Sequence, residues 1–404
     1  MRFSQLFGKT QREIPGEAET VSHRLLLRTG MINQLTAGVY SYMPLAWRTS
    51  RKIMDIIRDE MEAAGGQEIT LPVLQPLELW QKSGRDAAFG ANLFKLNDRK
   101  ERPLALGPTH EEVVTSLAAQ YIQSYRDLPQ RLYQIQTKLR DEPRPRGGLI
   151  RVREFIMKDM YSFDADEAGL EISYQKMVQA YKNIYHRCGL KAMAIEADSG
   201  AIGGKASHEF MVLAESGEDE VISCSGCGYA ANLEKAAFDK GQTASEEPLP
   251  AEEVATPGRE SIEDVSAFLE LPQSRMLKCV FYVADGEFVI AVIRGDLEVN
   301  EVKLKNALKA AELRLATADE VSAAGMVAGS ASPAGFGGKV IADDSVSEQV
   351  NYVGGANISG RHMKNLNLGR DFTVFKRADI ASATAGARCA RCGGTLESIR
   401  GIEV

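Results

Sequence analysis

Apolar side chains recur with a helical period in three stretches of the chain. In residues 45–64 they fall at helical spacing and two glycines follow at once, which predicts a helix that ends at the glycines. Residues 172–189 (ISYQKMVQAYKNIYHRCG) show the same period and predict an amphipathic helix closed by Gly189. Residues 102–122 (RPLALGPTHEEVVTSLAAQYI) predict a strand, a tight turn and a helix.

Alternating positions predict strands between these helices. Residues 133–142 (YQIQTKLRDE) place apolar residues and threonine on one face, with glutamine, lysine and arginine on the other. Residues 149–163 (LIRVREFIMKDMYSF) predict a second strand, joined to the first by the loop PRPRGG. Residues 68–76 (EITLPVLQP) predict a strand with an internal proline, which favours a sheet edge or an interface.

The second half of the chain has a different character. Residues 241–264 carry seven acidic residues against one basic residue, together with prolines, which predicts a linker and an insertion boundary. Residues 262–380 predict a small α/β domain, with a hairpin that turns at Asp285-Gly286 and a helix over residues 298–313. At 404 residues the chain is long enough for two or three domains.

Composition narrows the class of protein without naming a function. Apolar content of 44% and charged content of 25% are those of an ordinary globular protein. A net charge of -7 gives no overall attraction to nucleic acid or to an anionic membrane, so such binding would need a local patch. The sequence shows neither a signal peptide nor an apolar run long enough to span a membrane. We therefore expect a cytoplasmic protein whose thiols stay reduced.

Four of the six cysteines form two C-x-x-C pairs that run directly into glycine, CSGCGY and CARCGG. Two such pairs supply the four thiolates of a structural zinc site, here Cys224, Cys227, Cys389 and Cys392. The interval between the pairs far exceeds a normal zinc ribbon, so we interpret them as two halves that flank an inserted domain. The alternative is two unrelated turns with free thiols. Cys188 and Cys279 are isolated and are interpreted as core or surface residues.

Candidate chemistry concentrates in residues 131–160, which hold eight Lys or Arg against four acids in a chain that is acidic overall. Six of the eight are arginine, the side chain suited to bidentate phosphate contacts. Because they lie on two predicted strands joined by a loop, a sheet face can direct several guanidinium groups to one point. The alternative is a solvated face with surface ion pairs.

The segment TKLRDEPRPRGGLIRVREFIMKDMYSF resembles motif 2 of class II aminoacyl-tRNA synthetases, in the form found in bacterial-type prolyl-tRNA synthetases. MINQLTAGVYSYMPLAWR and TLPVLQPLELW resemble the N-terminal segment and motif 1, GPTHEE the Thr-x-Glu loop, and DSGAIGGKASHEF the proline-binding loop. The linker-bounded segment resembles the editing insertion. The resemblance implies an α+β fold: a class II antiparallel sheet with flanking helices, interrupted by an α/β editing-type insertion, in a homodimer.

The resemblance also implies a domain plan. Residues 1–223 would form the catalytic core with motifs 1 and 2, and residues 241–384 the linker and editing-type insertion. Residues 224–240 and 385–404 would form a zinc-ribbon-like junction and the return to the core. We find neither motif 3, with its Gly-x-Gly-x-x-Arg, nor an anticodon-binding domain in these 404 residues.

By the family pattern the chain would activate proline with ATP and Mg²⁺ and transfer it to tRNA(Pro). Arg140 would hold the α-phosphate and Arg151 the γ-phosphate. Glu142 would accept a hydrogen bond from the adenine amino group, and Phe155 would stack on the ring. Catalysis of this step is mainly positioning and charge stabilisation.

Thr109 and Glu111 would hold the cationic imino group of proline, with His208 beside a glycine-rich loop that can close over the substrate. A second interpretation of the first motif is structural, because Thr109-x-x-Glu112 also has the spacing of a helix capping box. The two interpretations are compatible if Glu112 caps the helix while Glu111 points elsewhere.

The insertion would correct a selectivity problem. A pocket that accepts proline discriminates against the smaller alanine by only about 1–3 kcal/mol per methylene, so a second site that hydrolyses alanyl-tRNA would be needed. The resemblance places Lys278, Gly329 and His362 at that editing site. For Lys278 the alternative is a solvent-facing strand lysine.

Three interpretations of the whole chain follow. The first is a proline–tRNA ligase with post-transfer editing, present here as a C-terminally truncated chain. The second is a stand-alone aminoacyl-tRNA deacylase, and the third is a non-catalytic paralogue that acts as a partner. The first is preferred because Arg140, Glu142 and Arg151, which serve only activation, are all present.

Overall fold

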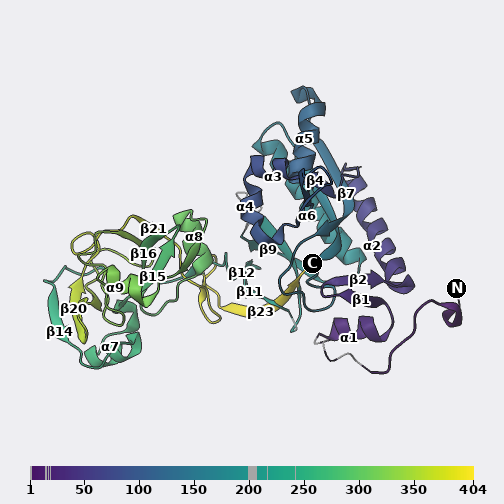
Figure 1. The fold of residues 1–404 in the computed structure, drawn as a ribbon. Coiled ribbons are helices and arrows are strands. Elements are labelled where there is room, and N and C mark those ends of the chain that lie inside the picture. The colour runs from purple at the N-terminus through teal and green to yellow at the C-terminus, as the bar shows by residue number, and fades with distance from the viewer. Residues whose placement is uncertain are drawn as a thin grey trace. The chain divides into compact units, whose positions relative to one another are not determined.

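A computed structural model describes residues 2–404 apart from 14, 15, 17, 19, 199–206, 216 and 242. The chain divides into two compact units (Figure 1). The first unit contains the described residues of Met1–Met193 together with Val404, and the second those of Ala194–Asp198 and Lys205–Glu403. The domain limits predicted at residues 223, 240 and 384 stay predictions.

The first unit is a mixed α+β structure. Its helices are η1 (Phe3–Gln5), α1 (Val21–Arg28), α2 (Pro44–Ala63), α3 (Leu77–Ser83), α4 (Arg85–Phe89), η2 (Gly90–Asn92), α5 (Glu111–Tyr121), η3 (Tyr125–Asp127) and α6 (Glu167–Arg187). Its strands are β1 (Ile32–Thr36), β2 (Val39–Tyr42), β3 (Gln67–Glu68), β4 (Leu74–Pro76), β5 (Lys95–Asn97), β6 (Pro103–Leu106), β7 (Gln130–Leu139) and β8 (Glu154–Phe163). No helix in the described parts of the chain is both long and apolar enough to cross a membrane.

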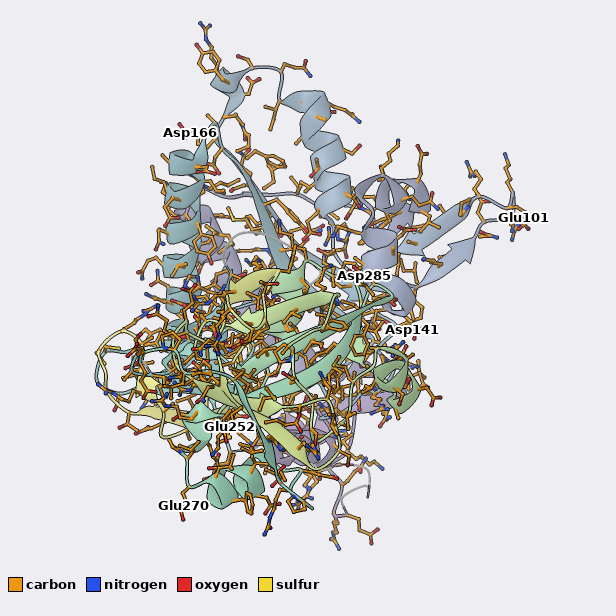
Figure 2. The ribbon with its side chains drawn as sticks, turned by 90° about the vertical axis from the view of Figure 1, so that its left-hand side faces the viewer. Glu101, Asp141, Asp166, Glu252, Glu270 and Asp285 are labelled. Atoms are coloured by element: carbon orange, nitrogen blue, oxygen red, sulfur yellow. The ribbon has the colours of Figure 1, made fainter. Side chains whose placement is uncertain are left out.

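The two long strands β7 and β8 form an antiparallel ladder, and β3 pairs parallel to the other side of β7. Helices α2 and α6 pack together through a cluster that includes the buried side chains of Met61, Tyr133, Ala180 and Ile184. Both helices and both strands were predicted. Helix α6 begins at Glu167, before its predicted start at residue 172. The Asp166 carboxylate (labelled in Figure 2) is its N-cap and accepts from the backbone N–H of Gly169.

The predicted continuous strand over residues 68–76 is wrong. The structure has β3 and β4 in two different sheets, with irregular backbone around Pro72 between them. Proline has no N–H for a sheet ladder, so a strand through this position is disfavoured. Strand β4 pairs with β6, and β6 pairs with β5 in a hairpin whose tip carries Glu101 (Figure 2).

The second unit begins with a small closed barrel. Its strand order is β10–β23–β11–β12–β9, and the strands are β9 (Ala192–Ala197), β10 (Ser207–Leu213), β11 (Asp219–Cys224), β12 (Ala230–Asn232) and β23 (Leu396–Glu403). β23 pairs antiparallel with both β10 and β11. The barrel is therefore built from segments on both sides of the predicted insertion. Short strands β13 (Phe238–Asp239) and β22 (Arg388–Cys389) pair beside it.

The intervening segment folds around two further sheets. Its strands are β14 (Glu252–Ala255), β15 (Leu277–Ala284), β16 (Glu287–Arg294), β17 (Leu313–Leu315), β18 (Lys339–Asp343), β19 (Tyr352–Gly355), β20 (Arg361–Leu366) and β21 (Lys376–Ala378). Its helices are α7 (Ile262–Leu269), η5 (Gln273–Arg275), α8 (Glu301–Leu308) and α9 (Ala318–Ala323). The predicted hairpin is β15–β16, and its turn residues Asp285 and Gly286 have φ of 48° and 83°, as a tight hairpin turn requires.

Two buried lysines tie this segment to the chain that enters and leaves it. The ammonium group of Lys240 lies 2.9 Å from Asp343 and 2.6 Å from Asp379 and also contacts Asp344. Lys303 pairs with Asp379 at 3.0 Å and donates to two backbone carbonyls. Each buried charge is thus paired and hydrogen-bonded, which is the condition for tolerating it in an interior.

Candidate active site and cysteine site

Arg140 follows directly on β7 and is held by the neighbouring strand. Its backbone N–H donates to the carbonyl of Arg153 at 2.9 Å, and its guanidinium lies 5.3 Å from the centre of the Phe155 ring. One guanidinium nitrogen also lies 3.5 Å from the carbonyl oxygen of Pro108. The structure therefore brings together two predicted ATP-binding residues and places them beside the turn that precedes α5.

Glu142 and Arg151, the other two predicted ATP-binding residues, form an ion pair at 3.0 Å. The loop between them is closed by reciprocal backbone hydrogen bonds of Arg146 and Arg151. Partial burial opposes ionisation of Glu142, but the Arg151 hydrogen bond and the backbone N–H of Arg144 keep the pKa of Glu142 below its ordinary value. The carboxylate is charged and oriented, as an acceptor for a ligand amino group must be.

Thr109 and Glu111 contact each other at the start of α5, where the Thr109 hydroxyl donates to Glu111 at 2.5 Å. The predicted capping box is wrong: His110 is the N-cap and its side chain makes no cap hydrogen bond. Glu112 is instead buried and accepts from Ser83 and Arg85, each at 2.9 Å. A buried carboxylate needs such a cation, and this demand outweighs the weaker gain from capping.

Arg85 is a site residue that the sequence did not reveal. It donates to Glu111 at 3.2 Å as well as to Glu112. Its guanidinium lies 5.5 and 5.3 Å from the ring centres of Trp80 and Phe89, which themselves pack edge to face. The aromatic faces stabilise its charge where water is excluded. Arg85 lies outside the charged segment of residues 131–160, and no periodic pattern marks it.

A buried polar cluster beneath the turn was also missed. Lys138 and His110 are fully buried, and Asp159 is nearly so. The Lys138 ammonium lies 2.5 Å from His110 Nδ1 and 2.8 Å from Asp159. Burial and then the neighbouring Lys138 charge lower the pKa of His110, while burial lowers the pKa of Lys138 itself. The polar face of β7 is thus partly an interior face.

His208, the third predicted proline-binding residue, lies in β10 of the second unit and is exposed. The glycine-rich loop that precedes it, residues 199–206, lies outside the described residues. The next residue, Glu209, is half-buried: burial and then the Glu403 carboxylate raise the pKa of Glu209 to about 7.

Glu209 makes the stability of the second unit depend on pH. In the unfolded chain the group ionises near 4.5, so between pH 4.5 and 7 only the unfolded state loses this proton and stability falls as pH rises. We expect Glu209→Gln to stabilise the unit at pH 8 by about 1 kcal/mol, after allowance for solvent screening, or about 2–4 °C in thermal midpoint. An equal gain at pH 4.5 would contradict this explanation.

The three predicted editing residues line one cavity of about 380 Å³ in the second unit. Lys278 lies on β15, and its ammonium donates to the carbonyl of Leu297 at 2.9 Å and to Glu298 at 2.5 Å. His362 lies on β20 with its Nδ1 2.7 Å from the Thr256 hydroxyl, and burial lowers its pKa. The ring is therefore neutral at physiological pH.

Gly329 lines the same cavity from the loop between α9 and β18, residues 324–338. Its φ of 78° lies in the left-handed region, and an added Cβ would come within 2.9 Å of Glu260, so only glycine fits without a shift. Cys279 also lines the cavity, and burial raises the pKa of its thiol to about 12. This thiol is protonated and unreactive at physiological pH, in line with its interpretation as a core or surface residue and not a ligand.

The two cysteine pairs meet as predicted. Sγ of Cys224 lies 3.5 Å from that of Cys392, Sγ of Cys227 lies 3.7 Å from that of Cys389, and all four lie within 4.8 Å of one another. A tetrahedral zinc site with Zn–S bonds of about 2.3 Å has S···S edges of about 3.8 Å. The backbone N–H of Gly394 donates to Cys392. The cluster fits a tetrahedral metal ion.

Two family models match the sequence. Residues 94–253 match the tRNA synthetase class II core domain (G, H, P, S and T), and residues 256–372 match the aminoacyl-tRNA editing domain. The first match covers the segment with Arg140 and Glu111, and the second covers the cavity with Lys278 and His362. The editing match begins within the predicted linker of residues 241–264.

Curated relatives match along the whole chain. A proline–tRNA ligase of Dehalococcoides mccartyi strain 195 is 66% identical over 405 residues, and one of Geobacter sp. strain M21 is 53% identical over 409 residues. The matches cover 100% of this chain and 71% of each relative. Among solved structures, a Giardia lamblia prolyl-tRNA synthetase in complex with prolyl-adenylate matches with a TM-score of 0.44 and 22% identity over 48% of this chain and 41% of that one.

Proposed function

Because the chain belongs to the family of bacterial-type proline–tRNA ligases, we propose that it activates proline with ATP and transfers the prolyl group to tRNA(Pro). Class II synthetases use ATP with Mg²⁺, which in such sites is held largely by the substrate phosphates. The observation that carries the proposal is the meeting of Arg140 and Phe155 beside the Thr109–Glu111 turn.

In the activation step the proline carboxylate attacks the α-phosphorus of ATP, and pyrophosphate leaves with the electrons of the broken P–O bond. Arg140 stabilises the negative charge on the α-phosphoryl oxygens, and Arg151 contacts the γ-phosphate. Glu142 accepts from the adenine amino group. The Glu142–Arg151 ion pair supports these roles, because it orients both side chains on one loop before the nucleotide arrives.

Proline enters as a cation at its imino nitrogen and needs a carboxylate partner. Glu111 supplies it, and the Thr109 hydroxyl and Arg85 fix the direction of that carboxylate. Since Arg85 already neutralises the buried Glu112, the charge of Glu111 remains for the substrate. The role of His208 stays a prediction from the resemblance, since His208 lies in β10 of the second unit.

Proline-dependent exchange of pyrophosphate into ATP tests the activation step directly. Exchange by the 404-residue chain above the level of Arg140→Ala supports the ligase. Absence of exchange together with hydrolysis of alanyl-tRNA would favour a stand-alone deacylase, and absence of both would favour a non-catalytic partner.

Editing of mischarged alanyl-tRNA belongs to the same proposal, because Lys278, Gly329 and His362 line one cavity. The cavity is walled by Ile262, Val265 and Phe281 and so offers an apolar space for a small side chain. The Lys278 ammonium is anchored at its rim by Glu298, whose side chain is 74% exposed. The Lys278 side chain is 20% exposed, and its ammonium can exchange the exposed Glu298 carboxylate for the phosphate backbone or terminal ribose of tRNA.

Lys278→Ala is expected to lower hydrolysis of alanyl-tRNA by about tenfold or more, the loss of one charge-assisted contact of about 1.5–3 kcal/mol. Pyrophosphate exchange should not change. Lys376→Ala is the matched control, since Lys376 is an exposed lysine of the same sheet that does not line the cavity. Equal hydrolysis by both variants would remove Lys278 from the editing site.

Three further features complete the proposal. The four-cysteine cluster holds a structural Zn²⁺, which is compatible with a cytoplasmic protein whose thiols stay reduced.

The motif 1 resemblance supports a homodimer, which sedimentation equilibrium tests. A monomer at all concentrations would contradict it.

A further inference from the structure

The buried lysine of β7 is costly, and a buried carboxylate compensates its charge. Lys138 has no exposed surface, and its ammonium lies 2.8 Å from Asp159 and 2.5 Å from His110 Nδ1. Asp159 also accepts from Gln134 at 2.9 Å and from the Tyr161 hydroxyl at 2.6 Å. Apolar residues of similar size often replace a buried ion pair without loss of stability, so stability alone does not explain this pair.

The network ends on the residue between the two proposed proline ligands. His110 Nε2 lies 3.1 Å from the carbonyl of Pro72 and donates to it, which leaves Nδ1 as the acceptor for Lys138. The backbone N–H of His110 donates to the Tyr161 hydroxyl at 3.0 Å. Hydrogen bonds therefore fix both the ring and the backbone N–H of His110. Thr109 and Glu111 are its two neighbours in the chain.

The other end of the network lies on the strand that delivers Arg140. Lys138 stands two residues before Arg140, which follows β7 directly and is tied to the residue preceding β8 by the hydrogen bond from its backbone N–H to the Arg153 carbonyl. Asp159 and Tyr161 lie on β8, the strand that also carries Phe155. Rigid strand geometry therefore connects the turn with Thr109 and Glu111 to the arginine proposed to hold the α-phosphate.

We propose that Lys138, Asp159 and His110 form a positioning network that aligns the Thr109–Glu111 turn with Arg140, so that its integrity sets the rate of adenylate formation. This inference rests on the proposed ligase function. The carboxylate of proline must meet the α-phosphorus in line with the leaving group, and an error of about 1 Å in such a geometry can cost about 100-fold in rate.

The test compares the 404-residue wild-type chain with Lys138→Met and with the double variant Lys138→Met/Asp159→Leu in pyrophosphate exchange and thermal unfolding. The single change leaves Asp159 buried without its cation, whereas the double change removes both charges and is expected to recover most of the lost stability. We expect kcat/KM for proline to fall about 100-fold in both variants, with the KM for ATP within about threefold of wild type.

Lys303→Met is the matched control, because Lys303 is a buried lysine paired with Asp379 at 3.0 Å in the second unit. It should lower stability and leave the exchange kinetics unchanged. Recovery of exchange in step with stability in the double variant would reduce the network to a structural role and overturn the inference. If the wild-type chain showed no pyrophosphate exchange, the ligase proposal would be overturned, and this inference with it.

Discussion

Arg140→Ala is expected to lower proline-dependent pyrophosphate exchange by about 1,000-fold. Charge develops on the phosphoryl oxygens in the transition state, and removal of one preorganised donor costs about 100- to 1,000-fold, with arginines in phosphoryl transfer at the upper end. The Phe155 ring and the Pro108 carbonyl position the Arg140 side chain. We therefore expect that no neighbouring side chain replaces its guanidinium in the variant.

Two further variants test whether the expected loss is specific to the Arg140 guanidinium. Arg140→Lys keeps the charge but loses the planar fork, so we expect it to retain most of the defect. Arg144→Ala removes an exposed arginine of the same loop and is expected to keep wild-type exchange. If Arg140→Ala and Arg144→Ala behaved alike, the phosphate role of Arg140 would be wrong.

Loss of the metal is expected to have the largest effect on stability. A purified chain should contain one zinc ion, and Cys389→Ser should abolish it, because Cys389 is buried and contributes one of four thiolates. Structural zinc contributes on the order of 10 kcal/mol to folding in small zinc domains. Here the cluster joins β22 and the turn that follows it to the end of β11 and the turn after that strand, so its loss releases the junction of barrel and insertion.

Metal analysis and limited proteolysis measure this effect better than a single unfolding midpoint, because a chain with two units does not unfold in one step. We expect chelation to expose residues 224–240 and 385–395 to cleavage. Cys188→Ser serves as the control, since Cys188 lies in the first unit and outside the cluster. A full complement of zinc in Cys389→Ser would rule out the four-cysteine site.

Periodicity predicted the elements that depend on local pattern. Helix α2 was found within one residue of its predicted limits, and the β15–β16 hairpin turns at the predicted residues, because apolar spacing and turn residues decide them. Strands β7 and β8 were found with limits shifted by up to five residues. The meeting of the four cysteines, far apart in the sequence, also follows from their residue types. The gathering of Lys278, Gly329 and His362 at one cavity came from family resemblance, and no spacing rule would have given it.

The errors and omissions share a physical cause. The predicted capping box at Thr109 was wrong, and Arg85 was missed, for the same reason. The buried carboxylate of Glu112 pairs with a cation from another helix, and this tertiary contact is not visible in the local sequence. Lys138 belongs to a charged strand face that a sequence alone assigns to solvent or ligand. Only the structure shows that Asp159 and His110 cover it.

The position of β23 between β10 and β11 has a consequence for the order of folding during synthesis. The ribosome makes β10 and β11 first, and the strand that pairs with both emerges only after the whole insertion has been made. Local contacts form quickly, whereas pairings across such an interval must wait and must first overcome loop-closure entropy. In the nascent chain the insertion can therefore fold while the barrel is still open, with two strand edges exposed to wrong partners until translation reaches Leu396.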